Sequence, residues 1–402
     1  MLTNKTVVLG VTGSIAAYKM ANVASMLVKK HADVHVIMTK NAVNFINPIT
    51  FETLTGNKCL VDTFDRNFEF HVEHVALAKR ADIFMVAPAS ANVIGKIANG
   101  IADDMLTTTI MPARCPKLIA PAMNTGMLEN PIVQDNIEKL KKFGYEIIES
   151  ADGYLACGDT GKGKLPPEEL LVDYIMKHIA CKKDMAGMNV LVTAGATREA
   201  IDPVRYITNH STGKMGYAIA RQAMLRGANV TLVTGKTDIK PPAFVNVVNI
   251  ISAQDMYEAV VSESRKQDII IKAAAVADYR PSQVADNKIK KSDGDMCIEL
   301  TRTKDILGYL GKQREEEGLH SQLICGFSME TQNLIENSRA KLLKKKVDVI
   351  AANNLKEPGA GFGVDTNVLT LISKDDVCEL PLMSKEECAD KLLTYLMELK
   401  IK

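Results

Sequence analysis

Apolar residues in the first half of the chain fall into short runs that alternate with longer stretches of helix-like pattern. The helix-like stretches are Met20–Lys30 and Ile132–Lys142. The apolar runs with the pattern of buried strands are Val7–Val11, Val34–Met38, Ile83–Ala87 and Lys117–Ala120. Such alternation predicts βαβ units on a parallel sheet that helices cover on both faces.

The second half repeats this alternation and adds two elements at its end. Its strand candidates are Val190–Thr193, Val230–Thr234, Ile269–Ala273, Leu323–Gly326 and Val347–Ala351. Asn367–Ser373 has the pattern of a late hairpin or edge strand, and Lys385–Leu399 that of a closing amphipathic helix. The second half is therefore expected to form a parallel sheet of its own.

A polar joint separates the two halves. Cys181–Met188 (CKKDMAGM) follows a helix that is expected to begin at Pro166 and Pro167. We place the boundary between residues 185 and 186 within this joint. The predicted fold class is α/β, with two doubly wound parallel-sheet (Rossmann-like) domains at residues 1–185 and 186–402.

Composition narrows the class of protein. A chain of 402 residues with a formal net charge of +1 has no long-range attraction for nucleic acid or for an acidic membrane, so small-molecule substrates are expected. The eight cysteines form no C-x-x-C pair, and no histidine stands at zinc-ligand spacing, which indicates reduced thiols and no metal cage. The apolar run Val7–Ala17 is interrupted by Gly10 and Gly13 and is too short to span a bilayer. A cytoplasmic location is the resulting expectation.

Each half opens with the layout of a nucleotide-type site. Thr6–Met20 and Asn189–Tyr217 both run from an apolar strand through a Gly/Thr/Ser loop into a helix-like stretch. The free N–H groups and positive dipole at a helix N-terminus favour phosphate. Neither opening holds a full G-x-G-x-x-G, and the second strands end in Thr39 and Thr234, where an acid would hold an NAD ribose. Two sites and two reactions are predicted, with FMN or a nucleoside triphosphate favoured over NAD.

Candidate chemistry in the first half lies in five short segments. Gly13-Ser14 alone is explained by a tight turn and a helix cap. Pro88–Asn92 (PASAN) and Pro121–Asn124 (PAMN) both follow strands, where doubly wound sheets bind ligands. His74 lies among apolar residues, where most histidines are only packed. Cys157 lies in Ala156–Lys164 (ACGDTGKGK), which is too rich in glycine for a helix or central strand and indicates a flap that brings a thiol to a substrate.

Together these segments resemble the homo-oligomeric flavin-containing cysteine decarboxylases, a flavodoxin-like family. Decarboxylating an acylated cysteine needs an electron sink. The resemblance implies that FMN oxidises the substrate thiol to a thioaldehyde before carboxylate loss, and that Cys157 returns a proton. It implies that His74 and Asn124 act on and hold the carboxylate. The residues that it assigns to FMN are Gly13, Ser14, Thr39, Ser90 and Asn92.

Two positions depart from the pattern of that family. The PAMN run is usually followed by Met-Trp, and here Met127 is followed by Leu128. The flap usually ends Gly-Arg-Met, and here Lys164 replaces the arginine. Lysine keeps the charge but loses the bidentate fork of arginine, so the grip on the substrate is expected to differ.

The second half resembles the phosphopantothenate–cysteine ligases. The motifs are Gly195–Arg205 (GATREAIDPVR), Thr208–Gly216 (TNHSTGKMG), Ala273–Pro281 (AAAVADYRP) and Lys288–Lys291 (KIKK). The fusion of the two halves in this order is similar to the bacterial bifunctional enzymes of coenzyme A synthesis. On their own, the basic run Lys341–Lys346 would be a solvated helix face, Asp278 a turn residue and Ala273–Ala277 a close helix–strand contact.

The ligase resemblance implies that CTP, with Mg²⁺ held mainly by phosphates and water, activates 4'-phosphopantothenate as an acyl-nucleotide that the amine of cysteine attacks. Lys288 matches a lysine of the first half-reaction, and Asn209 matches the residue that holds and converts the intermediate. The residues that match nucleotide-binding positions are Ala273, Ala274, Ala275, Asp278, Lys288, Asp305, Ile306, Phe327, Lys341 and Lys345. Sequence alone does not decide between CTP and ATP.

The resemblance also implies a homo-oligomer, with trimeric contacts for the flavin half and dimeric contacts for the ligase half. Two other classes of function remain. An NAD(P)-dependent dehydrogenase with a divergent fingerprint would lack the yellow colour of oxidised flavin. A regulatory relative that binds another protein would be expected to lack the flap cysteine or the ligase half, and this chain has both.

Overall fold

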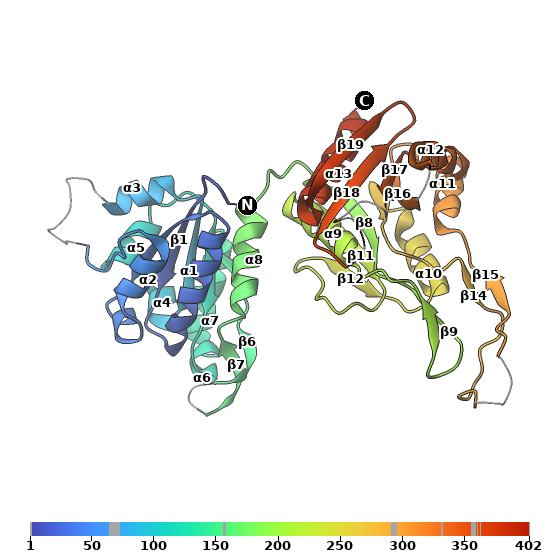
Figure 1. The fold of residues 1–402 in the computed structure, drawn as a ribbon. Coiled ribbons are helices and arrows are strands. Elements are labelled where there is room, and N and C mark those ends of the chain that lie inside the picture. Colours follow the sequence, from blue (N-terminus) through green and yellow to red (C-terminus); the bar gives the residue numbers. More distant parts are fainter. Residues whose placement is uncertain are drawn as a thin grey trace. The chain divides into compact units, whose positions relative to one another are not determined.

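The computed structural model describes residues 2–63, 73–155, 158–290, 296–330, 333–354, 359, 361 and 363–401. The chain divides into two compact units, Met1–Cys181 and Lys182–Lys402, each with its own sheet (Figure 1). This division falls at the start of the polar joint, in which the sequence places the boundary between residues 185 and 186. Strands and helices alternate along the chain in both units, as the apolar pattern predicts.

The first unit is built on a parallel sheet of five strands. In spatial order these are β2 (Asp33–Met38), β1 (Thr6–Val11), β3 (Ile83–Ala89), β4 (Lys117–Pro121) and β5 (Glu146–Ile147). This is the flavodoxin-like order, in which the connections reverse direction between β1 and β3. All residues of β1 and β3 are buried, because a parallel sheet is covered on both faces.

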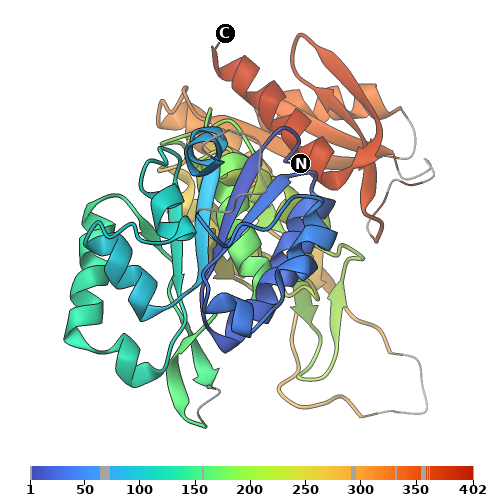
Figure 2. The ribbon, with the colours of Figure 1, turned by 90° about the vertical axis from the view of Figure 1, so that its left-hand side faces the viewer.

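Helices cover both faces of this sheet (Figure 2). They are α1 (Lys19–Lys29), α2 (Pro48–Thr55), α3 (Glu73–Arg80), α4 (Ala91–Ala98), α5 (Met105–Ile110), α6 (Thr125–Leu128), α7 (Pro131–Lys142) and α8 (Glu168–Ile179), with the short 3-10 turns η1 (Ile15–Tyr18) and η2 (Ala42–Asn44). Several begin at a signal readable in the sequence, such as Asn47 before Pro48 and Asn130 before Pro131.

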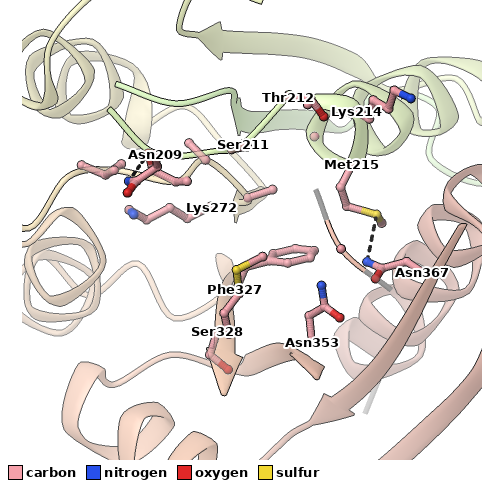
Figure 3. A pocket seen from close by; sticks show the side chains of 18 of the residues that line it. Asn209, Ser211, Thr212, Lys214, Met215, Lys272, Phe327, Ser328, Asn353 and Asn367 are labelled. Atoms are coloured by element: carbon pink, nitrogen blue, oxygen red, sulfur yellow. Dashed lines mark hydrogen bonds between the residues drawn. The ribbon is translucent and has the colours of Figure 1, made fainter. Parts of the chain in front are cut away.

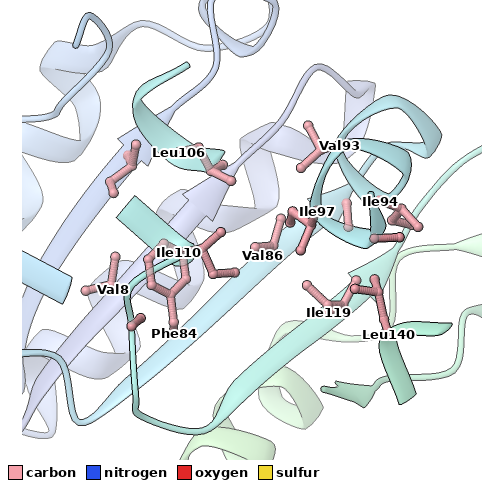
Figure 4. Packing of buried hydrophobic residues seen from close by; sticks show 14 of the residues in the cluster. Val8, Phe84, Val86, Val93, Ile94, Ile97, Leu106, Ile110, Ile119 and Leu140 are labelled. Atoms are coloured by element: carbon pink, nitrogen blue, oxygen red, sulfur yellow. The ribbon is translucent and has the colours of Figure 1, made fainter. Parts of the chain in front are cut away.

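One face of the first sheet packs on α4, α5 and α7 (Figure 4). Val8, Phe84, Val86 and Ile119 point into this core, where they meet residues such as Leu106. A Cβ on Gly10 would lie 2.9 Å from Leu106 Cδ1, so the glycine allows α5 to approach β1 closely. Since side chains alternate along a strand, Val7 and Leu9 face the opposite layer, where α1 and α8 pack.

The glycine-rich segment of the first unit forms a separate antiparallel hairpin. Its strands are β6 (Ala151–Tyr154) and β7 (Thr160–Lys164). The prediction that this segment is neither helix nor central strand is confirmed. Cys157, at the tip of the hairpin in sequence, lies outside the described residues.

The second unit holds an eight-stranded sheet. In spatial order it contains β12 (Asn246–Asn249), β11 (Asn229–Thr234), β8 (Asn189–Ala194), β13 (Ile269–Lys272), β16 (Leu323–Glu330), β17 (Val349–Asn354), β18 (Thr366–Ile372) and β19 (Val377–Ser384). The first six strands are parallel in the Rossmann order, which reverses between β8 and β13. The last two are antiparallel, so the sheet is mixed, and the late apolar run is one arm of a hairpin.

The helices of the second unit are α9 (Lys214–Leu225), α10 (Ala253–Ser264), α11 (Ile306–Glu316), α12 (Leu334–Lys345) and α13 (Lys385–Ile401). Two small antiparallel ribbons lie outside the main sheet: β9 (Arg198–Ala200) with β10 (Tyr206–Thr208), and β14 (Tyr279–Pro281) with β15 (Leu300–Arg302). The expected closing helix is α13, which packs on α9. Among the described residues, no helix is both long and apolar enough to cross a membrane.

Candidate active sites of the two units

The loops at the carboxyl ends of β1 and β3 enclose a cavity of about 1030 Å³ in the first unit. Four of the residues expected to bind FMN line it: Gly13, Thr39, Ser90 and Asn92. This is the point where the strand order reverses, which is where open α/β sheets bind ligands. A Cβ on Gly13 would lie 2.7 Å from Asn41 Cβ, so glycine is required where these two loops meet.

Hydrogen bonds hold the loop after β3 in place. The Thr12 hydroxyl donates to the Pro88 carbonyl (2.6 Å) and accepts from the Ser90 N–H (3.0 Å). Ser90 in turn caps α4, where its hydroxyl accepts from the Val93 N–H (3.4 Å). The cavity therefore has the N-terminus of α4 in its wall, with Lys96 one turn further along and paired with Asp103 (2.8 Å).

A second cavity of about 400 Å³ lies between the loops after β1 and β4 and the β6–β7 hairpin. Ser14 and Asn124 line it together with Lys164 of β7. The Asn124 side chain caps α6 by accepting from the Gly126 N–H (2.8 Å), and its amide donates to Asp159 (3.3 Å). The structure thus brings Asn124 and the glycine-rich hairpin together around one cavity.

Glycine at position 163 allows the hairpin to dock on the PAMN segment. Gly163 has φ +130°, and a Cβ there would lie 2.1 Å from the Met123 carbonyl oxygen. The Met123 N–H donates to the Gly163 carbonyl (3.0 Å), and the Thr125 hydroxyl donates to the Lys162 carbonyl (2.7 Å). A side chain at position 163 would push the hairpin off this surface.

His74 is not brought to either cavity of the first unit. It lies half-buried in the first turn of α3, which packs on α5, and it is absent from the residues that line the two described cavities. Its assigned action on the substrate carboxylate therefore stays a prediction, as does the role of Cys157.

In the second unit, a cavity of about 420 Å³ opens at the carboxyl ends of β13, β16 and β17, beside the start of α9 (Figure 3). The predicted site residues that line it are Asn209, Ala273, Ala274, Ala275, Asp278, Phe327 and Lys341. The Asn209 amide donates to the Ala275 carbonyl (3.2 Å), and the Lys341 ammonium donates to the Phe327 carbonyl (3.2 Å). We call this space the switch-point cavity, because it lies where the sheet order reverses.

Next to it lies a cavity of about 490 Å³ that is rich in cations, which we call the basic cavity. Predicted residues Asp278, Asp305, Ile306 and Lys345 line it. Arg302, Lys304, Lys344 and Lys272 add further positive charge. Such a site suits a polyanion.

Asp305 is held firmly at the N-terminus of α11. It accepts from the Gly308 N–H (3.0 Å) and forms an ion pair with Lys345 of α12. Burial raises the pKa of Asp305, but the hydrogen bonds from Lys345 and Gly308 outweigh it, so the net pKa is lowered. Asp305 is thus ionised at neutral pH and fixes the end of Lys345 at the cavity wall.

Lys288 is not brought to either of these cavities. It is exposed on the long segment between β14 and β15. Its neighbour Ile289 is anchored, because the Ile289 N–H donates to Asp202 (3.1 Å) and its carbonyl accepts from Arg205 (3.0 Å). The hydrogen bond from Arg205 keeps the pKa of the buried Asp202 below its ordinary value, so this anchor is a charged pair.

The structure adds four site residues that the sequence analysis missed: Lys272, Asn353, Asn367 and Lys385, all of which line the switch-point cavity. Asn353 Oδ1 and Asn367 Oδ1 are buried without a hydrogen-bond partner among the described residues, which marks both as acceptors that a ligand could satisfy. Burial of its ammonium, followed by the charge of Lys341, lowers the pKa of Lys272 to about 8. A lysine at the end of the apolar strand Ile269–Lys272 was the signal available in the sequence.

Comparison with known proteins assigns each half to a described family. A family described as "Flavoprotein" matches residues 1–180, and one described as "DNA/pantothenate metabolism flavoprotein C-terminal domain" matches residues 185–399.

No group of three or more possible metal ligands (His, Cys, Asp or Glu) occurs in the described part of the chain.

Curated relatives match over the full length. The coenzyme A biosynthesis bifunctional protein CoaBC of Bacillus subtilis (strain 168) is 48% identical over 397 residues, covering 98% of this chain and 97% of that protein. Its namesake from Haemophilus influenzae is 41% identical, covering 99% and 98%. A crystal structure of the C-terminal domain of a CoaBC protein has 43% identity and a TM-score of 0.46, covering 54% of this chain and 98% of that one.

Proposed function

The chain belongs to the family of bifunctional coenzyme A biosynthesis proteins, and we propose that each of its two activities belongs to one half of the chain. Residues 186–402 carry the phosphopantothenate–cysteine ligase activity, and residues 1–185 carry the phosphopantothenoylcysteine decarboxylase activity. The ligase joins cysteine to 4'-phosphopantothenate. The decarboxylase then converts the product to 4'-phosphopantetheine. The ligase assignment rests on the adjoining switch-point and basic cavities, whose linings share Lys272, Val276 and Asp278.

FMN is the cofactor of the first unit in this proposal. The cavity between the loops after β1 and β3 is roomy, polar and bounded by the N-terminus of α4, all of which suit a flavin mononucleotide. Thr39, Ser90 and Asn92 would hold it, with Gly13 allowing close approach and Ser14 at the border of the neighbouring cavity. Bound flavin supplies the reversible oxidation of the substrate thiol that makes carboxylate loss possible.

The second cavity of the first unit would hold the substrate of the decarboxylase. The Asn124 amide lies in its wall and can donate to the carboxylate that is lost. Lys164 offers a single cationic contact where the family has the fork of arginine. In this proposal the thiol of Cys157 would give a proton to the product.

In the second unit the acid occupies the switch-point cavity and the nucleotide occupies the basic cavity. Buried acceptors on Asn353 and Asn367 would receive hydrogen bonds from hydroxyl or amide groups of 4'-phosphopantothenate. Lys341 and Lys345 would bind the triphosphate of CTP, with Mg²⁺ held by phosphates and water. Asn209 would hold the acyl-nucleotide, and Lys288 would reach the phosphates through movement of its anchored segment.

The enzyme is further proposed to be a cytoplasmic homo-oligomer. Ile15 and Tyr18 are 59% and 57% exposed beside the substrate cavity of the first unit, which is apolar surface suited to a second copy. A second copy could also bring His74 to a cavity that its own chain does not place it in. Trimeric contacts for the first unit and dimeric contacts for the second are the proposed arrangement.

The test is the mass of the product that the purified chain forms from 4'-phosphopantothenate, cysteine, CTP and Mg²⁺ without added flavin. Formation of 4'-phosphopantetheine supports both assignments. Cys157→Ser should stop at phosphopantothenoylcysteine, and Asn209→Asp should accumulate the acyl-nucleotide. No conversion by the wild type would refute the proposal, and equal rates with ATP would refute the preference for CTP.

A further inference from the structure

Lys272 stands where the two cavities of the second unit meet. It is the last residue of β13, paired in register with Thr193 of β8 and with Gly326 of β16. Strands on both sides therefore fix its backbone at the point where the sheet order reverses. The side chain lines the switch-point cavity together with Asn209 (Figure 3). It also lines the basic cavity together with Asp305.

The ammonium of Lys272 is not satisfied within the described part of the chain, where it has neither a hydrogen bond nor an ion pair. Four charged groups face it from three elements. Lys341 and Lys345 come from α12, Asp305 from the start of α11 and Asp278 from the loop after β13. Asp305 is already paired with Lys345, and the charge of Lys341 offsets that of Asp278, so Lys272 adds a positive charge that only a further anion would balance.

We propose that Lys272 is a catalytic residue of the ligase, whose ammonium contacts both the carboxylate of the acid in the switch-point cavity and the α-phosphate of the nucleotide in the basic cavity. This inference rests on the function proposed above. In the step, a carboxylate oxygen forms a bond to the α-phosphorus while the bond from that phosphorus to the bridging oxygen of pyrophosphate breaks. Pyrophosphate leaves with the electron pair, and Lys272 keeps its proton throughout.

A cation at this junction performs two tasks. It reduces the repulsion between two anions that must come into bonding distance, and it stabilises the charge that gathers on the phosphate oxygens in the transition state. Binding of the anionic substrates also favours the protonated form of Lys272, reversing the effect of burial and of the two α12 lysines. The free enzyme, whose Lys272 pKa is about 8, should therefore lose activity as the pH rises through that value.

The experiment measures pyrophosphate release in single turnovers of the full-length enzyme with 4'-phosphopantothenate, CTP and Mg²⁺, without cysteine. Lys272→Met keeps the length of the side chain and removes its charge, and it should slow release by about 100-fold. Lys272→Arg keeps the charge, should restore most of the rate, and should move the fall of that single-turnover rate above pH 8 to higher pH. Lys312→Met is the matched control, since Lys312 is 70% exposed on the outer side of α11.

The outcomes separate the inference from the proposed function. Absence of pyrophosphate release by the wild type would refute both. Release by the wild type with Lys272→Met within about threefold of it would overturn the role of Lys272 alone. Equal loss in the Met and Arg variants, with an unmoved pH profile, would also overturn the cation role. Thermal melting of Lys272→Met and Lys272→Gln checks folding, and neither should melt below the wild type, because each removes a half-buried charge that has no ion-pair partner among the described residues.

Discussion

Replacing Gly163 with alanine should separate the two activities of this enzyme. Gly163 has φ +130°, a region that costs a residue with a Cβ about 1 to 3 kcal/mol. The added Cβ would lie 2.1 Å from the Met123 carbonyl oxygen, so the β6–β7 hairpin must move. That movement breaks the 3.0 Å hydrogen bond between the Met123 N–H and the Gly163 carbonyl, which contributes about 0.5 to 1.5 kcal/mol.

The combined cost is about 1.5 to 4.5 kcal/mol against the docked hairpin, and each 1.4 kcal/mol is about tenfold in an equilibrium. Decarboxylation should fall by at least tenfold, because the hairpin forms one wall of the cavity proposed to hold the substrate. Ligation should be unchanged, since its cavities lie in the other unit.

The assay follows both products by mass, with phosphopantothenoylcysteine accumulating in Gly163→Ala. Gly144→Ala is the matched control. Gly144 also has a positive φ (+83°), but a Cβ there meets nothing within 4 Å. The reasoning is refuted if Gly163→Ala decarboxylates as fast as Gly144→Ala, or if its ligase activity falls in parallel.

Three further changes should act on stability. The His178 hydrogen bond lowers the pKa of Glu146 to about 2. The ionised Glu146 therefore stabilises the first unit above the ordinary pKa of 4.5, and this stabilisation is lost as the pH falls toward 2. In Glu146→Gln the urea concentration at the unfolding midpoint of the first unit should depend less on pH across that range. Phe84→Ala, in the core of the first unit, should cost about 3 to 5 kcal/mol in its denaturant unfolding and leave the second transition in place. Arg226 is 5% exposed and forms an ion pair with Asp184 (2.6 Å). Arg226→Ala should lower the free energy of unfolding of the second unit by about 3 to 5 kcal/mol in the same denaturant titration. A loss under 1 kcal/mol would show that the pair contributes little.

The family and its activities followed from local sequence. Motifs such as TNHSTGKMG and AAAVADYRP are long enough to be specific, and the apolar runs marked most of the sheet strands. Helix starts at Asn130 before Pro131 and at Pro167 were also readable. These features are set by residues close together in the chain, where backbone chemistry and alternation of side chains act directly.

Strand order and the late hairpin needed the tertiary structure. The apolar pattern predicts strands but not which strands are neighbours, so it could not show that order reverses between β1 and β3 or between β8 and β13. It left open whether Asn367–Ser373 was an edge strand or one arm of a hairpin, because both have the same alternation.

The sites divide in the same way. The sequence named Asn209, Asp278 and Phe327 through its resemblance to the ligases, and the first two lie within the motifs TNHSTGKMG and AAAVADYRP. Only the fold showed that Lys272 lines two cavities and that Asn353 and Asn367, which line one of them, have buried side-chain oxygens without a partner among the described residues. These residues come from separate strands, and their chemistry depends on burial and on charges brought from distant segments. The sequence gives the chemical type of each side chain, whereas the burial and the neighbouring charges of that side chain are set only when the sheet has formed.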